Sequence, residues 1–119
     1  MSDEFLKVAT AEINNEISEI QTILNSCRSS LDVYTNAAKI QKSTHKIKGL
    51  APMMGKEDLG DLSSLLDSLL KKIMNGIVVN EILESLIIAV DEMKKSMTCQ
   101  DYNLDKIKQK ISHMSSALS

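Results

Sequence analysis

Apolar residues recur at intervals of three and four positions along five stretches of this chain, and short polar or glycine-containing segments separate the stretches. Such spacing places the apolar side chains on one face of a helix, so each stretch predicts an amphipathic helix with one buried face. Residues that interrupt helices are scarce, since the 119 residues include one Pro and four Gly. We therefore expect an all-α fold with five helices.

The five helices are expected at about residues 3–26, 31–54, 56–74, 80–98 and 102–118. Every connection between them is short, which favours antiparallel packing of neighbouring helices. We expect the second to fifth helices to form an antiparallel up-and-down four-helix bundle, with the first helix packed along it. The positions expected to face inward on the first helix are Phe5, Val8, Ala9, Ile13, Ile17, Ile20, Ile23, Leu24 and Cys27, and those on the last are Leu104, Ile107, Ile111, Met114 and Leu118.

Residues that favour helix ends stand at several of the predicted boundaries. Asp32 can cap the start of the second helix, Gly55 is typical of a left-handed cap at its end, and Asn75-Gly76 ends the third helix. Pro52 lies shortly before Gly55, where its missing N–H and its ring predict a kink or a loosening of the last turn. The sequence indicates no functional role for this proline.

Length and composition indicate one domain covering residues 1–119, because an apolar content of 43% is enough for a single core. The net charge is −2 and basic residues are interleaved with acidic ones, so nucleic acid is not expected as a partner. No apolar run approaches the roughly 20 residues that span a bilayer, so we expect a cytoplasmic protein without membrane insertion. No helix has a second long apolar face, which predicts a monomer.

Cys27 and Cys99 stand alone in different segments and are expected to be reduced and structural.

One histidine lies on the polar side of the second predicted helix. The inward stripe of that helix runs through Val33, Ala37, Ile40, Thr44, Ile47, Ala51 and Met54. His45 is about 200° around the helix from Ile47, on the same side as Gln41, Lys48 and Gly49. Residues three and four apart on a helix are neighbours, so an exposed imidazole, a cation and a gap without a side chain should lie together.

The segment that follows this histidine reads His45-Lys46-Ile47-Lys48-Gly49-Leu50-Ala51-Pro52-Met53-Met54-Gly55. It resembles the signature of the histidine phosphotransfer domain: a histidine, two residues, lysine, glycine, then a short stretch ending in a large apolar residue and glycine. Within that family the chain is most similar to the N-terminal phosphotransfer domain of chemotaxis histidine kinases, over nearly its whole length. The resemblance implies a phosphoryl carrier whose donor is the ATP-bound catalytic domain of a histidine kinase and whose acceptor is an aspartate of a response-regulator receiver domain.

The resemblance also implies roles for individual residues. His45 would be phosphorylated on Nε2, Lys48 would stabilise the phosphoryl group, and Gly49 would leave space for a partner's active site. Asp67 stands 22 residues beyond His45, where chemotaxis members carry a glutamate that orients the imidazole. Because aspartate is one methylene shorter, two arrangements stay open: contact through water, or a closer approach of the helices. Ser64 replaces a second polar residue, often histidine, so we expect a smaller hydrogen-bond network.

No nucleotide-binding loop occurs in the chain, so this domain should have no cofactor of its own, and ATP and Mg²⁺ would belong to the kinase domain. If the chain is part of a chemotaxis kinase, the parent protein is the enzyme and this domain is its substrate. An alternative is a free-standing phosphotransfer protein with receiver domains on both sides of a multistep relay. An alternative of another class is a helical adaptor that is never phosphorylated. His113 has no carboxylate or lysine at matched spacing, so it predicts a structural or solvated side chain and no metal site.

Overall fold

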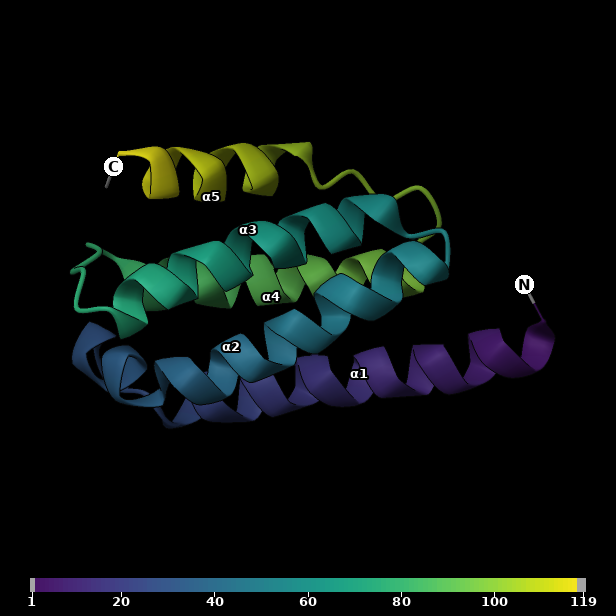
Figure 1. The fold of residues 1–119 in the computed structure, drawn as a ribbon, viewed down its shortest axis with the longest axis horizontal. Coiled ribbons are helices and arrows are strands. Elements are labelled where there is room, and N and C mark those ends of the chain that lie inside the picture. Colours follow the sequence, from purple (N-terminus) through teal and green to yellow (C-terminus); the bar gives the residue numbers. More distant parts are fainter. Residues whose placement is uncertain (1, 118–119) are drawn as a thin grey trace.

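The computed structural model describes residues 2–117, in which five α-helices account for most of the chain. In chain order they are α1 (Asp3–Ser26), α2 (Ser30–Met53), α3 (Glu57–Met74), α4 (Ile82–Thr98) and α5 (Asp105–Ser116). Successive helices run in opposite directions (Figure 1). The expected all-α fold of five helices is confirmed, with every described boundary within three residues of its expected place. Leu118, expected to face inward on the last helix, lies outside the described residues.

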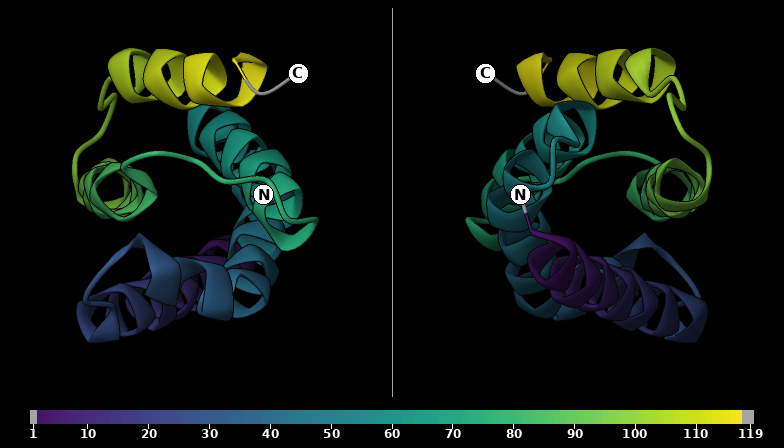
Figure 2. Two further views of the ribbon diagram at one scale, coloured as in Figure 1. Left: turned by 90° about the vertical axis from the view of Figure 1, so that its left-hand side faces the viewer. Right: turned by 90° about the vertical axis from the view of Figure 1, so that its right-hand side faces the viewer.

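The helices surround a common core, and the end-on views in Figure 2 show their order around it. α2 packs along α3, α1 lies against both α2 and α4, and α5 lies against α3 and α4. The first helix was expected to pack along a bundle of the other four. In the structure α1 lies between α2 and α4, and α5 lies between α3 and α4, so all five helices enclose the core.

The ends of α2 and α3 share one capping arrangement. Gly55 has φ 79° and Gly76 has φ 93°, a left-handed conformation that favours glycine. The N–H of Lys56 donates to the Ala51 carbonyl (2.9 Å), and the residue after Gly76 makes the equivalent bond to Lys72 (3.1 Å). These caps confirm the expected helix ends and let α3 turn back along α2.

At the start of α2, the cap differs from the one expected. The helix begins at Ser30, and Asp32 lies inside its first turn. The Asp32 carboxylate accepts a hydrogen bond from the backbone N–H of Arg28 (2.7 Å), which precedes the helix. Asp32 therefore stabilises the entry into α2 from within the helix, and its negative charge is favourable at this end.

The core confirms most of the predicted inward stripes. All seven stripe positions of α2 except the polar Thr44 belong to the apolar core, and Thr44 itself is buried. Val8 is an exception, since 61% of it is exposed. The buried face of α1 passes through Ala9, Ile13 and Ile17, and Val8 is one residue, about 100°, away from that line.

α2 and α3 approach closely at a pair formed by Pro52 and Gly60. A Cβ atom at Gly60 would lie 2.8 Å from Cγ and 3.0 Å from Cδ of the Pro52 ring. Further along the same side of α3, Ser63 and Asp67 are also buried. The proline thus has a packing role that the sequence did not indicate: its ring fills the space left by the missing side chain of Gly60.

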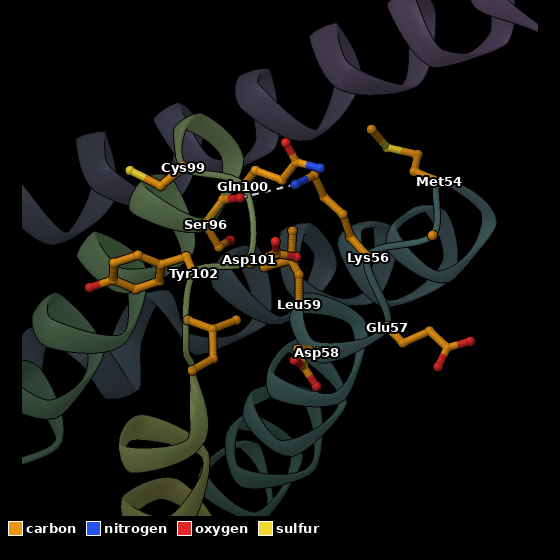
Figure 3. Close-up of a pocket in the computed structure, with 12 residues that line it drawn as sticks. Met54, Lys56, Glu57, Asp58, Leu59, Ser96, Cys99, Gln100, Asp101 and Tyr102 are labelled. Atoms are coloured by element: carbon orange, nitrogen blue, oxygen red, sulfur yellow. Dashed lines mark hydrogen bonds between the residues drawn. The ribbon is translucent and has the colours of Figure 1, made fainter.

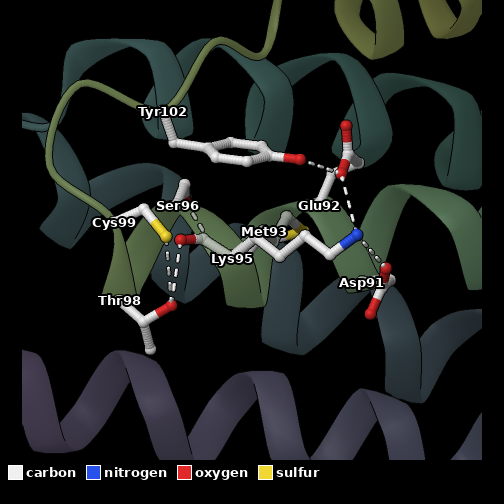
Figure 4. Close-up of polar contacts among 8 residues, drawn as sticks. All are labelled: Asp91, Glu92, Met93, Lys95, Ser96, Thr98, Cys99 and Tyr102. Carbon is white, nitrogen blue, oxygen red and sulfur yellow. Dashed lines mark hydrogen bonds and ion pairs between the residues drawn. The ribbon is translucent and has the colours of Figure 1, made fainter.

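Polar side chains hold the connections to the helices. The Tyr34 hydroxyl donates to the Val79 carbonyl (3.1 Å) and accepts from the Val79 N–H (3.0 Å), which holds the α3–α4 connection to α2. After α4, the Tyr102 hydroxyl donates to Glu92 (2.5 Å), and Lys95 pairs with the same carboxylate and with Asp91 (Figure 4). The Tyr34 and Tyr102 hydroxyls thus hold the two connections that flank α4 against α2 and α4.

Candidate functional site

His45 projects from the outer side of α2, and 62% of its side chain is exposed. The neighbouring residues Thr44 and Ile47 are buried, so the packing of α2 on the core sets the direction in which His45 points. The imidazole Nδ1 lies 3.7 Å from Oδ1 of Asp67 on α3. A proton on Nδ1 would face the carboxylate, and the lone pair of Nε2 would then be available on the solvent side.

Asp67 is the only charged side chain that is buried in the described part of the chain, with 2% of it exposed. The Gln41 amide donates to its Oδ1 at 2.6 Å. Its Oδ2 lies 3.2 Å from Nζ of Lys71 and 3.7 Å from Nζ of Lys48. Oδ1 of Asp67 therefore faces the imidazole and accepts from the amide, and Oδ2 faces two ammonium groups.

Because aspartate is shorter than glutamate, the sequence left open whether Asp67 reaches His45 through water or through a closer approach of the helices. At 3.7 Å, Nδ1 of His45 and Oδ1 of Asp67 are too far apart for a hydrogen bond but lie within ion-pair distance when the imidazole is protonated. Small residues stand on this side of α3, and Gly60 lets α3 come close to α2 at Pro52, while Ser63 is fully buried. A small rotation of the exposed imidazole would complete the hydrogen bond.

The environment of Asp67 favours its ionised form. Burial by itself would raise the pKa of this carboxyl, because the charged form loses hydration. Hydrogen bonds from Gln41 and Lys71, together with the charges of Lys71 and Lys48, outweigh burial, so the pKa of Asp67 lies below its usual range. Asp67 is therefore a carboxylate at neutral pH.

This lowered pKa predicts how stability depends on pH. Ionised Asp67 stabilises the fold above the pKa that it has in the unfolded chain, about 3.9, and this contribution is lost as pH falls through the lower folded value. Asp67→Asn should lose about 1.5 to 3 kcal/mol at pH 7, the range for hydrogen bonds to a charged group. Denaturant unfolding of both proteins between pH 2 and pH 7 checks this. The difference should be constant above about pH 5 and shrink below pH 4, and a difference independent of pH would contradict the assignment.

The surface beside His45 is open. No atom lies within 4 Å of the place where a Cβ of Gly49 would stand, and Gly49 is exposed. Lys48 lies one turn after His45 and next to Gly49 in sequence, with 40% of its side chain exposed and its ammonium turned toward Asp67. The structure thus brings together all four residues singled out in the sequence: His45, Lys48, Gly49 and Asp67.

Two further members of this cluster, Gln41 and Lys71, were not singled out as site residues. Gln41 lies one turn before His45 on α2, and Lys71 lies one turn after Asp67 on α3. Each stands four residues from a predicted site residue, and this helical spacing could have indicated that they belong to the site. The next residue, Lys72, donates to the carbonyl of Ser115 (2.8 Å) and ties α3 to α5. Ser64 makes no hydrogen bond to the cluster.

Other parts of the molecule do not offer a comparable cluster. Within residues 2–117, no group of three His, Cys, Asp or Glu side chains is placed to hold a metal ion, and His113 is exposed on α5. Cys27 and Cys99 are free thiols. No helix in the described part of the chain is both long enough and apolar enough to pass through a membrane.

The connections at one end of the bundle line a hollow of about 310 Å³ (Figure 3). It lies between the α2–α3 turn and the α4–α5 connection, and Lys56 reaches across to donate to the Ser96 carbonyl (3.0 Å). Met54, which directly follows α2 and lines the hollow, lies more than two helical turns beyond His45. The hollow is therefore separate from the cluster around Asp67.

Comparisons of the chain with protein-family models, with curated proteins and with solved structures found no significant match. The case for a function consequently depends on the geometry around His45 and on the resemblance of the segment from His45 to Gly55.

Proposed function

We propose that this domain is a phosphoryl carrier of two-component signal transduction. In this proposal His45 accepts a phosphoryl group from the ATP-bound catalytic domain of a histidine kinase and passes it to an aspartate of a response-regulator receiver domain. The resemblance to chemotaxis histidine kinases suggests chemotaxis as the pathway and the cytoplasm as the place. The observation that supports it most is an exposed imidazole whose Nδ1 faces a buried, ionised carboxylate.

The geometry suits nucleophilic attack by Nε2. The lone pair of Nε2 forms a bond to the γ-phosphorus, the bond between that phosphorus and the bridging oxygen breaks, and ADP leaves. The ring then carries its proton on Nδ1 and a positive charge, and Asp67 lies 3.7 Å from that nitrogen. The carboxylate stabilises this charged ring, and Lys48 can turn from Asp67 toward the phosphoryl oxygens.

Transfer to the receiver reverses these roles. A receiver carboxylate attacks the same phosphorus, the bond to Nε2 breaks, and the imidazole leaves as a neutral base that keeps its Nδ1 proton. His45 must be reachable from solvent for both steps, which agrees with the exposure of its side chain. No nucleotide site within the domain is required, because the donor and the acceptor each bring their own Mg²⁺.

The test is phosphorylation of the domain by the catalytic core of a chemotaxis kinase with radiolabelled ATP. We expect a label that is labile in acid and stable in alkali, that maps to the peptide containing His45, and that moves to an added receiver domain. Labelling by a phosphorylated receiver, and not by a kinase core, would instead indicate a multistep relay. Absence of label with all of these donors would contradict the proposal and favour the helical adaptor.

The open surface at Gly49 predicts that a bulky side chain there slows phosphoryl transfer with a protein partner much more than phosphorylation by a small donor. Gly49→Trp should reduce transfer to a receiver domain roughly 100-fold, because displacement of the reacting groups by a bulky side chain is costly. Phosphorylation by phosphoramidate, a small donor, should change much less. Gly49→Ala is the matched control and should transfer normally. Equal transfer rates for the Trp variant and the wild type would show that partners do not approach over Gly49.

A further inference from the structure

The charges around Asp67 do not balance when His45 is neutral. Two ammonium groups, Lys48 from α2 and Lys71 from α3, lie within 4 Å of a single oxygen of one carboxylate. Among the described residues, no other carboxylate lies within ion-pair distance of either lysine. Lys46, which is also near His45 in sequence, pairs with Glu16 instead. The cluster therefore has one positive charge in excess, beside an exposed imidazole.

Lys71 is free to leave Asp67 at little cost. Its side chain is 54% exposed, so its ammonium can move without being taken out of a buried position. Asp67 would keep the short hydrogen bond from Gln41 to its other oxygen and the ammonium of Lys48 beside Oδ2. The carboxylate can therefore give up one cation and stay hydrogen-bonded and ionised.

A phosphoryl group on His45 would supply the missing negative charge. A phosphate monoester carries about −1.5 to −2 charges at neutral pH and has three strong acceptor oxygens. One lysine matches neither the charge nor the number of acceptors, whereas two ammonium groups come much closer. Both lysines lie beside Oδ2 of Asp67, and the imidazole of His45 lies beside Oδ1 of the same carboxylate. The two ammonium groups thus come from different helices and are separated from the ring by a single carboxylate.

We propose that Lys71 is a second phosphoryl-binding residue, held on Asp67 until His45 is phosphorylated and then shared with the phosphoryl oxygens. This inference rests on the proposed carrier function of His45. The α2 lysine and the α3 lysine would hold the group from opposite helices, and Asp67 would keep the charged ring oriented. Lys71 would slow the loss of the phosphoryl group to water.

The test uses phosphoramidate, which avoids any need for the natural kinase. The Nε2 lone pair attacks phosphorus in the zwitterion, the P–N bond breaks, ammonia leaves, and the imidazole keeps its Nδ1 proton, so no other reactant is needed. The half-life of phosphorylated His45 is then measured after the donor is removed, by phosphorus NMR at neutral pH. The proteins compared are the wild type, Lys71→Met, Lys71→Arg, Lys48→Met and Lys42→Met.

We expect Lys71→Met to shorten the half-life roughly two- to fivefold, a range typical of ion pairs near the surface. Lys71→Arg should restore it, and 1 M salt should narrow the difference, because exposed charges are screened. Lys42→Met is the matched control: Lys42 lies as close to His45 in sequence as Lys48 does but forms no ion pair. It should leave the half-life unchanged.

Two failures can be told apart. If the wild type carries the label and Lys71→Met loses it at the wild-type rate, the role of Lys71 is refuted and the carrier function stands. If neither phosphoramidate nor a kinase core labels His45 in any of the proteins, the carrier function is refuted and the role of Lys71 with it.

Discussion

His45→Gln should abolish phosphorylation while leaving the fold as stable as the wild type. Glutamine has no nucleophilic nitrogen, so label from a kinase core should fall to background. The side chain is 62% exposed, so the free energy of unfolding should change by about 0.5 kcal/mol or less. The two measurements are label incorporation and chemical denaturation of the same samples.

His113→Gln provides the matched control for this prediction. His113 is also exposed on a helix, but no carboxylate of residues 2–117 lies within ion-pair distance of it. The variant should be labelled as fast as the wild type, and its label should be equally labile in acid. Equal labelling of His45→Gln and the wild type would place the phosphoryl group on another residue.

Gly60→Ala should destabilise the domain by about 1 to 3 kcal/mol, the typical cost of overpacking a tight interface. The added Cβ would stand 2.8 Å from Cγ of Pro52. A proline ring cannot rotate out of the way as a flexible side chain can, so α2 and α3 must separate. Denaturant unfolding of the variant and the wild type measures the effect. An unchanged midpoint would show that the helices adjust freely at this point.

The controls use the contrast between two helical glycines. Gly49→Ala meets open space and should stabilise the domain by up to about 1 kcal/mol, the difference in helix propensity. Pro52→Ala removes the ring, so Gly60→Ala should cost less in that background, and a double-mutant cycle measures the coupling. A cost that is the same with and without Pro52 would assign the destabilisation to another contact.

The fold could be derived from the sequence because its elements are local. Spacings of three and four identified the helices, and Gly55 and the Asn75-Gly76 pair marked two of their ends. The same spacing placed His45 outside and Ile47 inside α2, as the structure confirms. The prediction that Val8 faces inward was wrong, because an apolar side chain next to a buried stripe is not necessarily part of that stripe.

The helical period predicted only the part of the candidate site that lies on α2. His45, Lys48 and Gly49 lie within two turns of one helix, so the helical period alone brings them together. Asp67 was assigned from a resemblance, and its distance from His45 depends on how closely α3 packs against α2. Gln41 and Lys71 could be assigned to the site only once the position of Asp67 was known, since both contact this carboxylate and not the imidazole.

By itself, the sequence determined five helices, their buried faces and an exposed histidine beside a lysine and a glycine, because all of these follow from the geometry of a single helix. Tertiary packing alone decided that α1 closes the bundle, that Pro52 fills the space at Gly60, and that one buried carboxylate joins an amide, an imidazole and two ammonium groups. The physical reason is that contacts between helices depend on the shapes of both surfaces, and no periodicity within one segment specifies them.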